Sequence, residues 1–318
     1  MDVKIIGDSH NNLHPQYLYT GQTQQMNDLL RDEKAAVEIV YSFPETAAAV
    51  YEKREPSNFG IYSVNTIQST GLSESALNSK MKSYLSDLGF YSGEMGGGYT
   101  EEFRKALKCF QKAYFGAVWY SVDSKVTDSL QREIETAGTI YYKNLTNSKL
   151  NDALKKLGFG SNPAISDKQN FARIQTFFER AMGCNKYQAA GIMGNIKQES
   201  NFHPTSRNGA TLGILQWRDE RRGYLEKYAS INGYSAPDNM GIQLAFFRYE
   251  VSRYWGKGDV EENAGNSHLV DGWNTLKNQY KYSFYDVSDY FKKNIEGCKD
   301  ESEQIRRDYS SIIYQAIC

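Results

Sequence analysis

The sequence predicts a mainly α protein, and three segments with helical spacing lead to this prediction. In each of them apolar residues recur at every third or fourth position, which places them on one face of a helix. The three sets are Leu77, Met81, Tyr84, Leu85 and Leu88; Phe103, Ala106, Leu107, Phe110 and Ala113; and Ala189, Ile192, Met193 and Ile196. We expect at most a small β element, near residues 205–217.

Composition and charge narrow the class of function. The 318 residues are 40% apolar, which is enough for the cores of two or three domains. With 37 Lys and Arg against 38 Asp and Glu, the net charge is -1, which argues against nucleic acid as a partner. The 24 tyrosines and 4 tryptophans suit stacking on sugar rings. Composition alone therefore favours a carbohydrate ligand only slightly.

No targeting or membrane-spanning segment is expected. The first residues lack the basic stretch and long apolar run of a secretory signal, and no window reaches the length of a membrane span. An extracellular target would be reached by lysis, by assembly into a particle, or after removal of a signal that is absent here.

Cysteine and histidine spacing predicts neither a metal site nor a cofactor. The four cysteines are too widely spaced for a CxxC motif and too few for a disulfide scaffold, so we expect thiols. The four histidines show no HExxH or comparable ligand spacing.

The first 140 residues divide into an arm and a helical unit. Residues 1–70 are polar and are expected to form an N-terminal arm of unknown role. Residues 71–140 predict three helices: the first ends at Gly89, the second opens at Glu101 and Glu102, and the third starts near Asp123. This unit resembles the peptidoglycan-binding repeat of wall hydrolases in its LGF turn, its GEMGGGY loop and its AxxxFQ helix. The alternative is a helical spacer that binds nothing.

A second LGF segment suggests a duplicated helix and turn. Residues 147–159 repeat residues 78–90 at an offset of 69, with seven identities in thirteen positions. Because no complete third helix of the repeat follows, residues 141–165 are interpreted as a linker built from a degenerate repeat. Residues 166–318 form the next domain.

Glu199 is the candidate catalytic residue of that domain. It lies three residues beyond Ile196, on the continuation of an apolar helical face, and Pro204 ends the helix soon afterwards. An apolar surround and the negative end of a helix dipole both favour the protonated carboxyl that a general acid needs. The alternative is a solvated carboxylate at the end of a helix.

The residues around Glu199 carry a family resemblance. The segments ESNFHP and GATLGILQW resemble the ES-x-F-x-P and GA-x-GL-x-Q motifs of the lysozyme-like superfamily, which includes lytic transglycosylases. The wider pattern, down to Glu296, Arg306 and Tyr309, is closer still to the phage tail lysozyme family. This resemblance implies a lysozyme-like helical domain with Glu199 as the catalytic acid.

Four further residues are expected to bind substrate or to shape its site. Gln216 offers donors and an acceptor to an N-acetyl or hydroxyl group, and Trp217 offers a ring face to a sugar. Ser200 and Phe202 are expected at the same site, where they orient the end of the Glu199 helix. Alternatively, Trp217 is a core residue and Gln216 braces a loop.

A second carboxylate would decide the mechanism. Retaining glycosidases place it about 5 Å from the acid, and inverting ones about 6.5–9.5 Å away. Asp219 is the first candidate because it is the first carboxylate after the Gln-Trp pair; Glu220 and Glu250 come next. The charged run from Asp219 to Arg222 is alternatively a solvated helix start.

The function that the sequence favours is a muramidase acting on bacterial peptidoglycan. The alternatives are a lytic transglycosylase, in which Glu199 acts alone, and a non-catalytic wall-binding or tail-structural protein. The resemblance implies action on the cell wall from outside, as a component of a phage tail or tail-like particle or after release by lysis. Because these motifs lie beyond residue 165, a chain that lacks residues 1–165 is predicted to stay folded and active.

Overall fold

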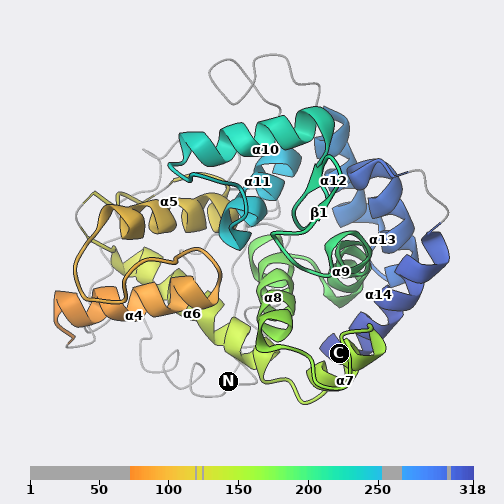
Figure 1. Ribbon diagram of the computed structural model, residues 1–318, viewed down its shortest axis with the longest axis horizontal. Coiled ribbons are helices and arrows are strands. Elements are labelled where there is room, and N and C mark those ends of the chain that lie inside the picture. The colour runs from red at the N-terminus through yellow and green to blue at the C-terminus, as the bar shows by residue number, and fades with distance from the viewer. Residues whose placement is uncertain (1–71, 119, 124, 253–266, 299–301) are drawn as a thin grey trace, which may run out of the picture. The chain divides into compact units, whose positions relative to one another are not determined.

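The computed structural model describes residues 72–118, 120–123, 125–252, 267–298 and 302–318 (Figure 1). All of these residues belong to one unit of the chain. The predicted N-terminal arm lies outside the described residues.

Three amphipathic helices open the described chain: α4 (Glu74–Asp87), α5 (Glu101–Phe115) and α6 (Asp128–Leu145). Each has a hydroxyl cap, because Ser73, Thr100 and Thr127 accept a hydrogen bond from the backbone N–H three residues further on. The second helix begins at Glu101 as predicted. The third begins at Asp128 rather than near Asp123, because the cap is Thr127.

The two LGF turns have the same backbone hydrogen bonds. Gly89 and Gly158 both have positive φ, at 85° and 88°. The N–H of Phe90 donates to the carbonyl of Leu85, five residues back, and the equivalent bond closes the turn after α7 (Leu150–Lys156). The sequence repeat therefore corresponds to a repeated helix end.

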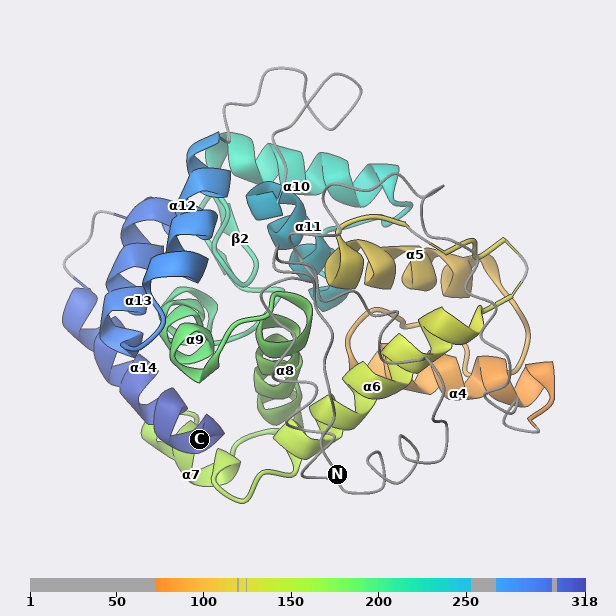
Figure 2. The same ribbon diagram turned by 180° about the vertical axis from the view of Figure 1, so that it is seen from behind.

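The remaining helices follow in order as far as residue 317. They are α8 (Ile165–Thr176), the π-helix η3 (Phe177–Ala181), α9 (Lys186–Ser200), α10 (Asp219–Ile231), α11 (Met240–Ser252), α12 (Ser267–Gln279), α13 (Phe284–Phe291), the π-helix η4 (Lys292–Glu296) and α14 (Glu303–Ile317). Helix α9 packs against α13 and α14 (Figure 1). Viewed from behind, α6 lies beside α8 (Figure 2).

A two-stranded sheet is the β structure of the described chain. Strands β1 (Arg207–Asn208) and β2 (Thr211–Leu212) pair antiparallel, with Arg207 opposite Leu212. The sheet lies inside the segment 205–217 that was expected to hold it. The prediction of a mainly α protein with at most a small β element is confirmed.

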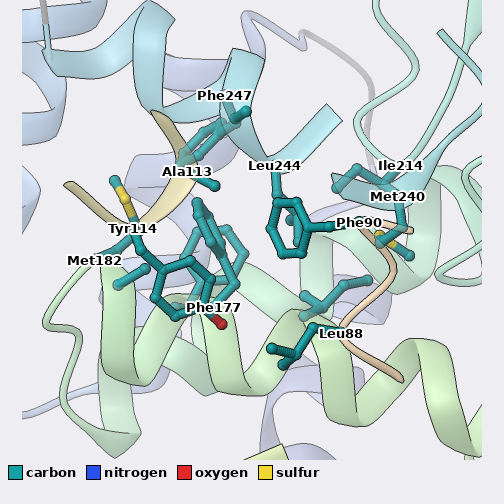
Figure 3. Close-up of a cluster of buried hydrophobic side chains, with 14 of the residues drawn as sticks. Leu88, Phe90, Ala113, Tyr114, Phe177, Met182, Ile214, Met240, Leu244 and Phe247 are labelled. Carbon is teal, nitrogen blue, oxygen red and sulfur yellow. The ribbon is translucent and has the colours of Figure 1, made fainter. Parts of the chain in front are cut away.

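One hydrophobic cluster joins the first three helices to the later ones (Figure 3). The ring of Tyr114 on α5 packs edge-on against Phe90 and against Phe177 of η3. Arg248 of α11 reaches into the same region, where its guanidinium donates to the carbonyl oxygens of Tyr114 and Ala181 at 3.2 and 2.6 Å. Residues on both sides of the predicted 141–165 linker therefore share a core.

No helix in the described part of the chain is long and apolar enough to cross a membrane.

Candidate active site

Helix α9 carries Glu199, and its sequence explains where the helix starts. Asn185 and Gln188 cap it reciprocally: each side chain accepts a hydrogen bond from the backbone N–H of the other residue. The predicted apolar stripe is fully buried, and it consists of Ala189, Ile192, Met193 and Ile196. The helix is therefore a fixed support for the residues at its end.

Two glycines let neighbouring helices approach α9 closely. A Cβ atom on Gly191 would lie 2.6 Å from the side chain of Val287 on α13. A Cβ atom on Gly194 would lie 2.1 Å from the hydroxyl of Ser310 on α14. Larger residues at these positions would push away the two helices that complete the Glu199 site.

The end of α9 is a left-handed turn. Asn201 has φ of 52°, and its N–H donates to the carbonyl of Lys197, while Phe202 has φ of 65°. Glu199 is the last residue but one of the helix, and its side chain is 19% exposed. The carboxylate is thus partly buried, as its place on the apolar stripe predicts.

Arg306 of α14 is the residue that holds this carboxylate. Its side chain is buried, and Nη2 donates to Oε1 of Glu199 at 2.5 Å. Nη1 donates to Oε2 of Glu296 and to Oδ1 of Asn195, both at 3.0 Å, and Nε donates to the Ser302 hydroxyl. One guanidinium therefore links two carboxylates in a fixed geometry. We expected apolar surroundings for Glu199, and the structure adds a cation.

Asn195 orients Arg306 from one turn below Glu199. Its Nδ2 donates to the carbonyl and the hydroxyl of Ser288 on α13, both at 3.1 Å. These bonds turn Oδ1 towards the guanidinium. Residues four apart lie on the same side of a helix, so Asn195 and Glu199 meet the same arginine.

Gln243 of α11 fixes the loop that follows Glu199. Its Oε1 accepts from the N–H of Ile214, and its Nε2 donates to the carbonyls of Pro204 and Pro237, both at 2.7 Å. The Ser200 hydroxyl donates to the carbonyl of Ile214 at 2.9 Å. Ser200 therefore ties the end of α9 to the loop and is buried in doing so.

Gln216 braces the same loop. Its Nε2 donates to the carbonyls of Gly213 and Ser206 at 2.8 and 3.1 Å, and its Oε1 accepts from the Thr211 hydroxyl. The side chain is buried and its polar atoms already have these partners. The structure thus matches the loop-brace alternative for Gln216 and does not present its amide to a substrate.

Trp217 lies in the core, which differs from the expected stacking role. The residue is 1% exposed, and its ring packs edge-on against Phe246 of α11. Nε1 donates to Oε2 of Glu250 at 2.8 Å. The Trp217 ring in this conformation has no face open to a sugar, because the neighbouring helices cover it.

Glu250, the third candidate for the second carboxylate, belongs to a buried ion pair. Nε and Nη2 of Arg221 donate to its two oxygens at 2.8 and 2.9 Å. Burial works against the charge on Arg221, but the Glu250 carboxylate raises the pKa of this guanidinium above its usual value. Glu250 thus joins α10 to α11 and is enclosed within the structure.

Phe202 is also fully buried. Its ring stacks on Phe159 of the second LGF turn, with centroids 6.0 Å apart, and meets Phe171 edge-on. Phe202 anchors the left-handed turn after Glu199 to α8 and to the segment before it. Like Ser200, it supports the helix end and offers no surface for substrate contact.

Asp219 is placed differently from the other predicted site residues. Its side chain is 79% exposed at the start of α10, 3.8 Å from the guanidinium of its neighbour Arg218, and its φ is 49°. Glu220 is exposed as well. Both carboxylates therefore lie at the surface, whereas the other predicted site residues are buried or partly buried.

Two surface hollows are formed by residues other than Glu199. One lies between α7 and α14, and the other lies beside α13 and η4. Within the described residues, no group of three or more His, Cys, Asp or Glu side chains is placed to hold a metal ion.

Arg306 and Gln243 are the site residues that residue-by-residue reasoning missed. The signal for Arg306 was its place in the closing Glu296, Arg306 and Tyr309 pattern, but the pattern did not tell which residue it contacts. Gln243 lies within a continuous apolar helix, where nothing in the sequence indicates that its partner is Ile214, 29 residues earlier.

Comparison with known proteins gives one match. Residues 169–317 match the family model described as phage tail lysozyme. No curated protein and no solved structure matches the chain.

Proposed function

Because residues 169–317 match the family model described as phage tail lysozyme, we propose that the chain is a muramidase, which hydrolyses the β-1,4 bond between N-acetylmuramic acid and N-acetylglucosamine. The match alone indicates a coarser function, that of a lysozyme-like enzyme acting on peptidoglycan. The finer assignment depends on Glu199 as the general acid.

The observation that carries the proposal is the place of Glu199, whose partly buried side chain lies at the end of α9 within the residues that match the family model. A general acid must keep one orientation towards the glycosidic oxygen while remaining open to it. The rigid end of α9 and the arginine supply the orientation. The exposed fraction of the side chain, 19%, supplies the access.

Arg306 has a further role in this mechanism. When Glu199 gives its proton to the leaving oxygen, it becomes a carboxylate, and a guanidinium in contact with it stabilises that charge. The same guanidinium also binds Glu296, so its positive charge is shared between two carboxylates. Arg306 is thus a positioning residue that acts through Glu199.

The second step separates the muramidase from a lytic transglycosylase. A hydrolase uses a second carboxylate to activate water or stabilise the sugar cation, and Asp219 remains the proposed residue for that task. The transglycosylase is the second candidate, because Asp219 is 79% exposed and Glu250 is enclosed by its partners. In that reaction the C6 hydroxyl of muramic acid takes the place of water.

Glu199→Gln tests the proposal directly. The amide keeps the shape of the side chain but cannot donate the proton, so cleavage of purified peptidoglycan should fall at least about 100-fold. Glu226→Gln is the matched control, since it removes a surface carboxylate that pairs with Arg222. A folded Glu199→Gln variant that clears walls at the wild-type rate would refute the assignment.

Mass spectrometry of the digest then distinguishes the two reactions. A muramidase leaves reducing N-acetylmuramic acid ends, whereas a transglycosylase leaves 1,6-anhydro ends. If Asp219→Asn also loses most of its turnover, Asp219 is the second carboxylate. Normal turnover by Asp219→Asn together with anhydro products would establish the single-acid reaction.

The setting that fits this function is the tail of a phage or a tail-like particle, acting on the bacterial wall from outside. The three helices α4–α6 would then be a wall-binding unit, as their resemblance to a peptidoglycan-binding repeat implies.

A further inference from the structure

Helix α13 presents two very different faces. Val287, Ser288 and Phe291 are buried, and Val287 and Ser288 meet α9. Tyr285 and Asp286 are exposed on the same helix. The inner face of α13 thus supports the Glu199 helix, whereas the outer face is open to ligands.

An open hollow of about 370 Å³ lies beside this outer face. Its lining combines aromatic rings with charged and amide side chains, and consists of Tyr280, Asp286, Asp289, Tyr290, Lys293 and Asn294. The Tyr280 and Tyr290 rings form a pair with centroids 4.5 Å apart and planes 33° apart. This pair joins the end of α12 to α13, so the aromatic part of the hollow is preformed.

Tyrosine is also exposed next to the hollow. Tyr282 is 83% exposed, and Tyr285 is among the exposed large side chains of the described chain. The segment 280–290 therefore carries four tyrosines at the surface or close to it. Exposed aromatic residues in one place mark interaction sites, because single soluble domains otherwise bury such area.

The charges around the hollow favour a neutral ligand. Asp289 accepts from Nε of Arg307 at 2.9 and 3.1 Å, and this carboxylate raises the pKa of Arg307. Asp286 and Lys293 add one charge of each sign. The lining therefore has no excess positive charge with which to attract a polyanion. Carboxylate and amide oxygens at the edge of an aromatic surface instead suit sugar hydroxyl and N-acetyl groups.

We propose that this tyrosine hollow, formed by the six lining residues, binds a neutral glycan strand of N-acetylhexosamines. The Tyr280 and Tyr290 rings contact the sugar faces, while Asp286 and Asn294 hydrogen-bond to their polar substituents. The nature of the glycan rests on the proposed function, since a peptidoglycan-acting enzyme meets such strands throughout the wall. The hollow adds a binding surface that includes neither Glu199 nor Arg306.

The test measures binding of chitohexaose to the full chain by NMR, in a Glu199→Gln background that prevents turnover. Chitohexaose is expected to shift the resonances of the lining residues. Replacing both rings, in Tyr280→Ala with Tyr290→Ala, should weaken this binding at least about tenfold, which corresponds to about 1.4 kcal/mol. Tyr224→Ala is the matched control, because Tyr224 is a partly buried tyrosine of α10 that belongs neither to the lining of the hollow nor to α4–α6.

Asp286→Ala is the second variant, and it keeps the test decisive if the double variant does not fold. Asp286 is exposed, so its loss should spare the fold and still weaken binding. The proposal would be refuted if chitohexaose shifted only the resonances of residues around Glu199, or if folded hollow variants bound it with wild-type affinity. Either result would leave the proposed muramidase function unaffected. An active Glu199→Gln enzyme would instead refute the proposed function, and binding at the hollow would still be measured.

Discussion

The helices α4–α6 and the helices around Glu199 differ in the partners of their buried cations. In the first region, Lys82 is buried, but its Nζ donates to the backbone carbonyl of Gly96 at 2.6 Å. Around Glu199, the buried cation Arg306 instead binds two carboxylates, those of Glu199 and Glu296. A carbonyl that loses its partner is neutral, whereas a carboxylate that loses its partner is a buried charge.

This difference indicates where the molecule keeps interactions for a purpose other than stability. Buried ion pairs are often no more stabilising than apolar residues of the same volume, but losing one partner is costly. The ionic network of Arg306 lies against the candidate acid. Within its described residues, the first region buries one charged residue, Lys82 of α4, and otherwise only neutral polar side chains, those of Asn78, Gln111 and Asn144.

The largest effect is expected from removing the first region altogether. The sequence predicted that a chain without residues 1–165 stays folded, but the shared core predicts the opposite. Such a chain loses Phe90 and Tyr114, which pack against the later helices, and the carbonyl of Tyr114 that Arg248 binds. Each buried aromatic ring contributes about 1.5–3 kcal/mol, and whole domains are stable by only about 5–15 kcal/mol.

We therefore expect the truncated chain to show no cooperative thermal transition in circular dichroism. A chain that begins at Leu72 keeps all of the described helices and serves as the control. A sharp transition and normal wall clearing by the truncated chain would show that residues 166–318 fold independently.

A smaller effect is expected from Arg306→Met. The methionine fills part of the space but leaves Glu199 and Glu296 without their shared cation, so the free energy of unfolding should fall by about 3–5 kcal/mol. Urea denaturation measures this loss. Arg306→Lys keeps the charge without the planar fork, and it should recover part of the stability but little of the cleavage rate. If the methionine variant is as stable as the wild type, the Arg306 ion pairs do not contribute to the stability of the fold.

The smallest effect is expected from Lys82→Met in the first region. The variant loses one hydrogen bond to Gly96 and the contacts of the ammonium with the Tyr91 and Phe103 rings. No buried charge remains, so the cost should be about 1–2 kcal/mol, measured in the same urea titration. If Lys82→Met loses as much unfolding free energy as Arg306→Met, the partners of the buried cations do not distinguish the two regions.

The candidate site was only partly predictable for a physical reason. Helical spacing put Glu199 at the end of a buried stripe, because periodicity within one helix is local information. Trp217 has the same residue type whether it covers a sugar or fills a core, and only the packing of α11 against it distinguishes the two. For Asp219, the position after Trp217 indicated proximity in the chain but not a fixed orientation.

The sequence by itself determined the apolar stripes of α4, α5 and α9, the duplicated LGF turn and the position of Glu199, because each depends on residues within about one or two turns of one another. Tertiary structure alone decided that Arg306, 107 residues further on, holds the Glu199 carboxylate, and that Glu250 is enclosed by Arg221 and Trp217. It also decided that helices on both sides of residue 150 share a core. These contacts join distant segments, and their partners follow from how whole helices pack rather than from any local pattern.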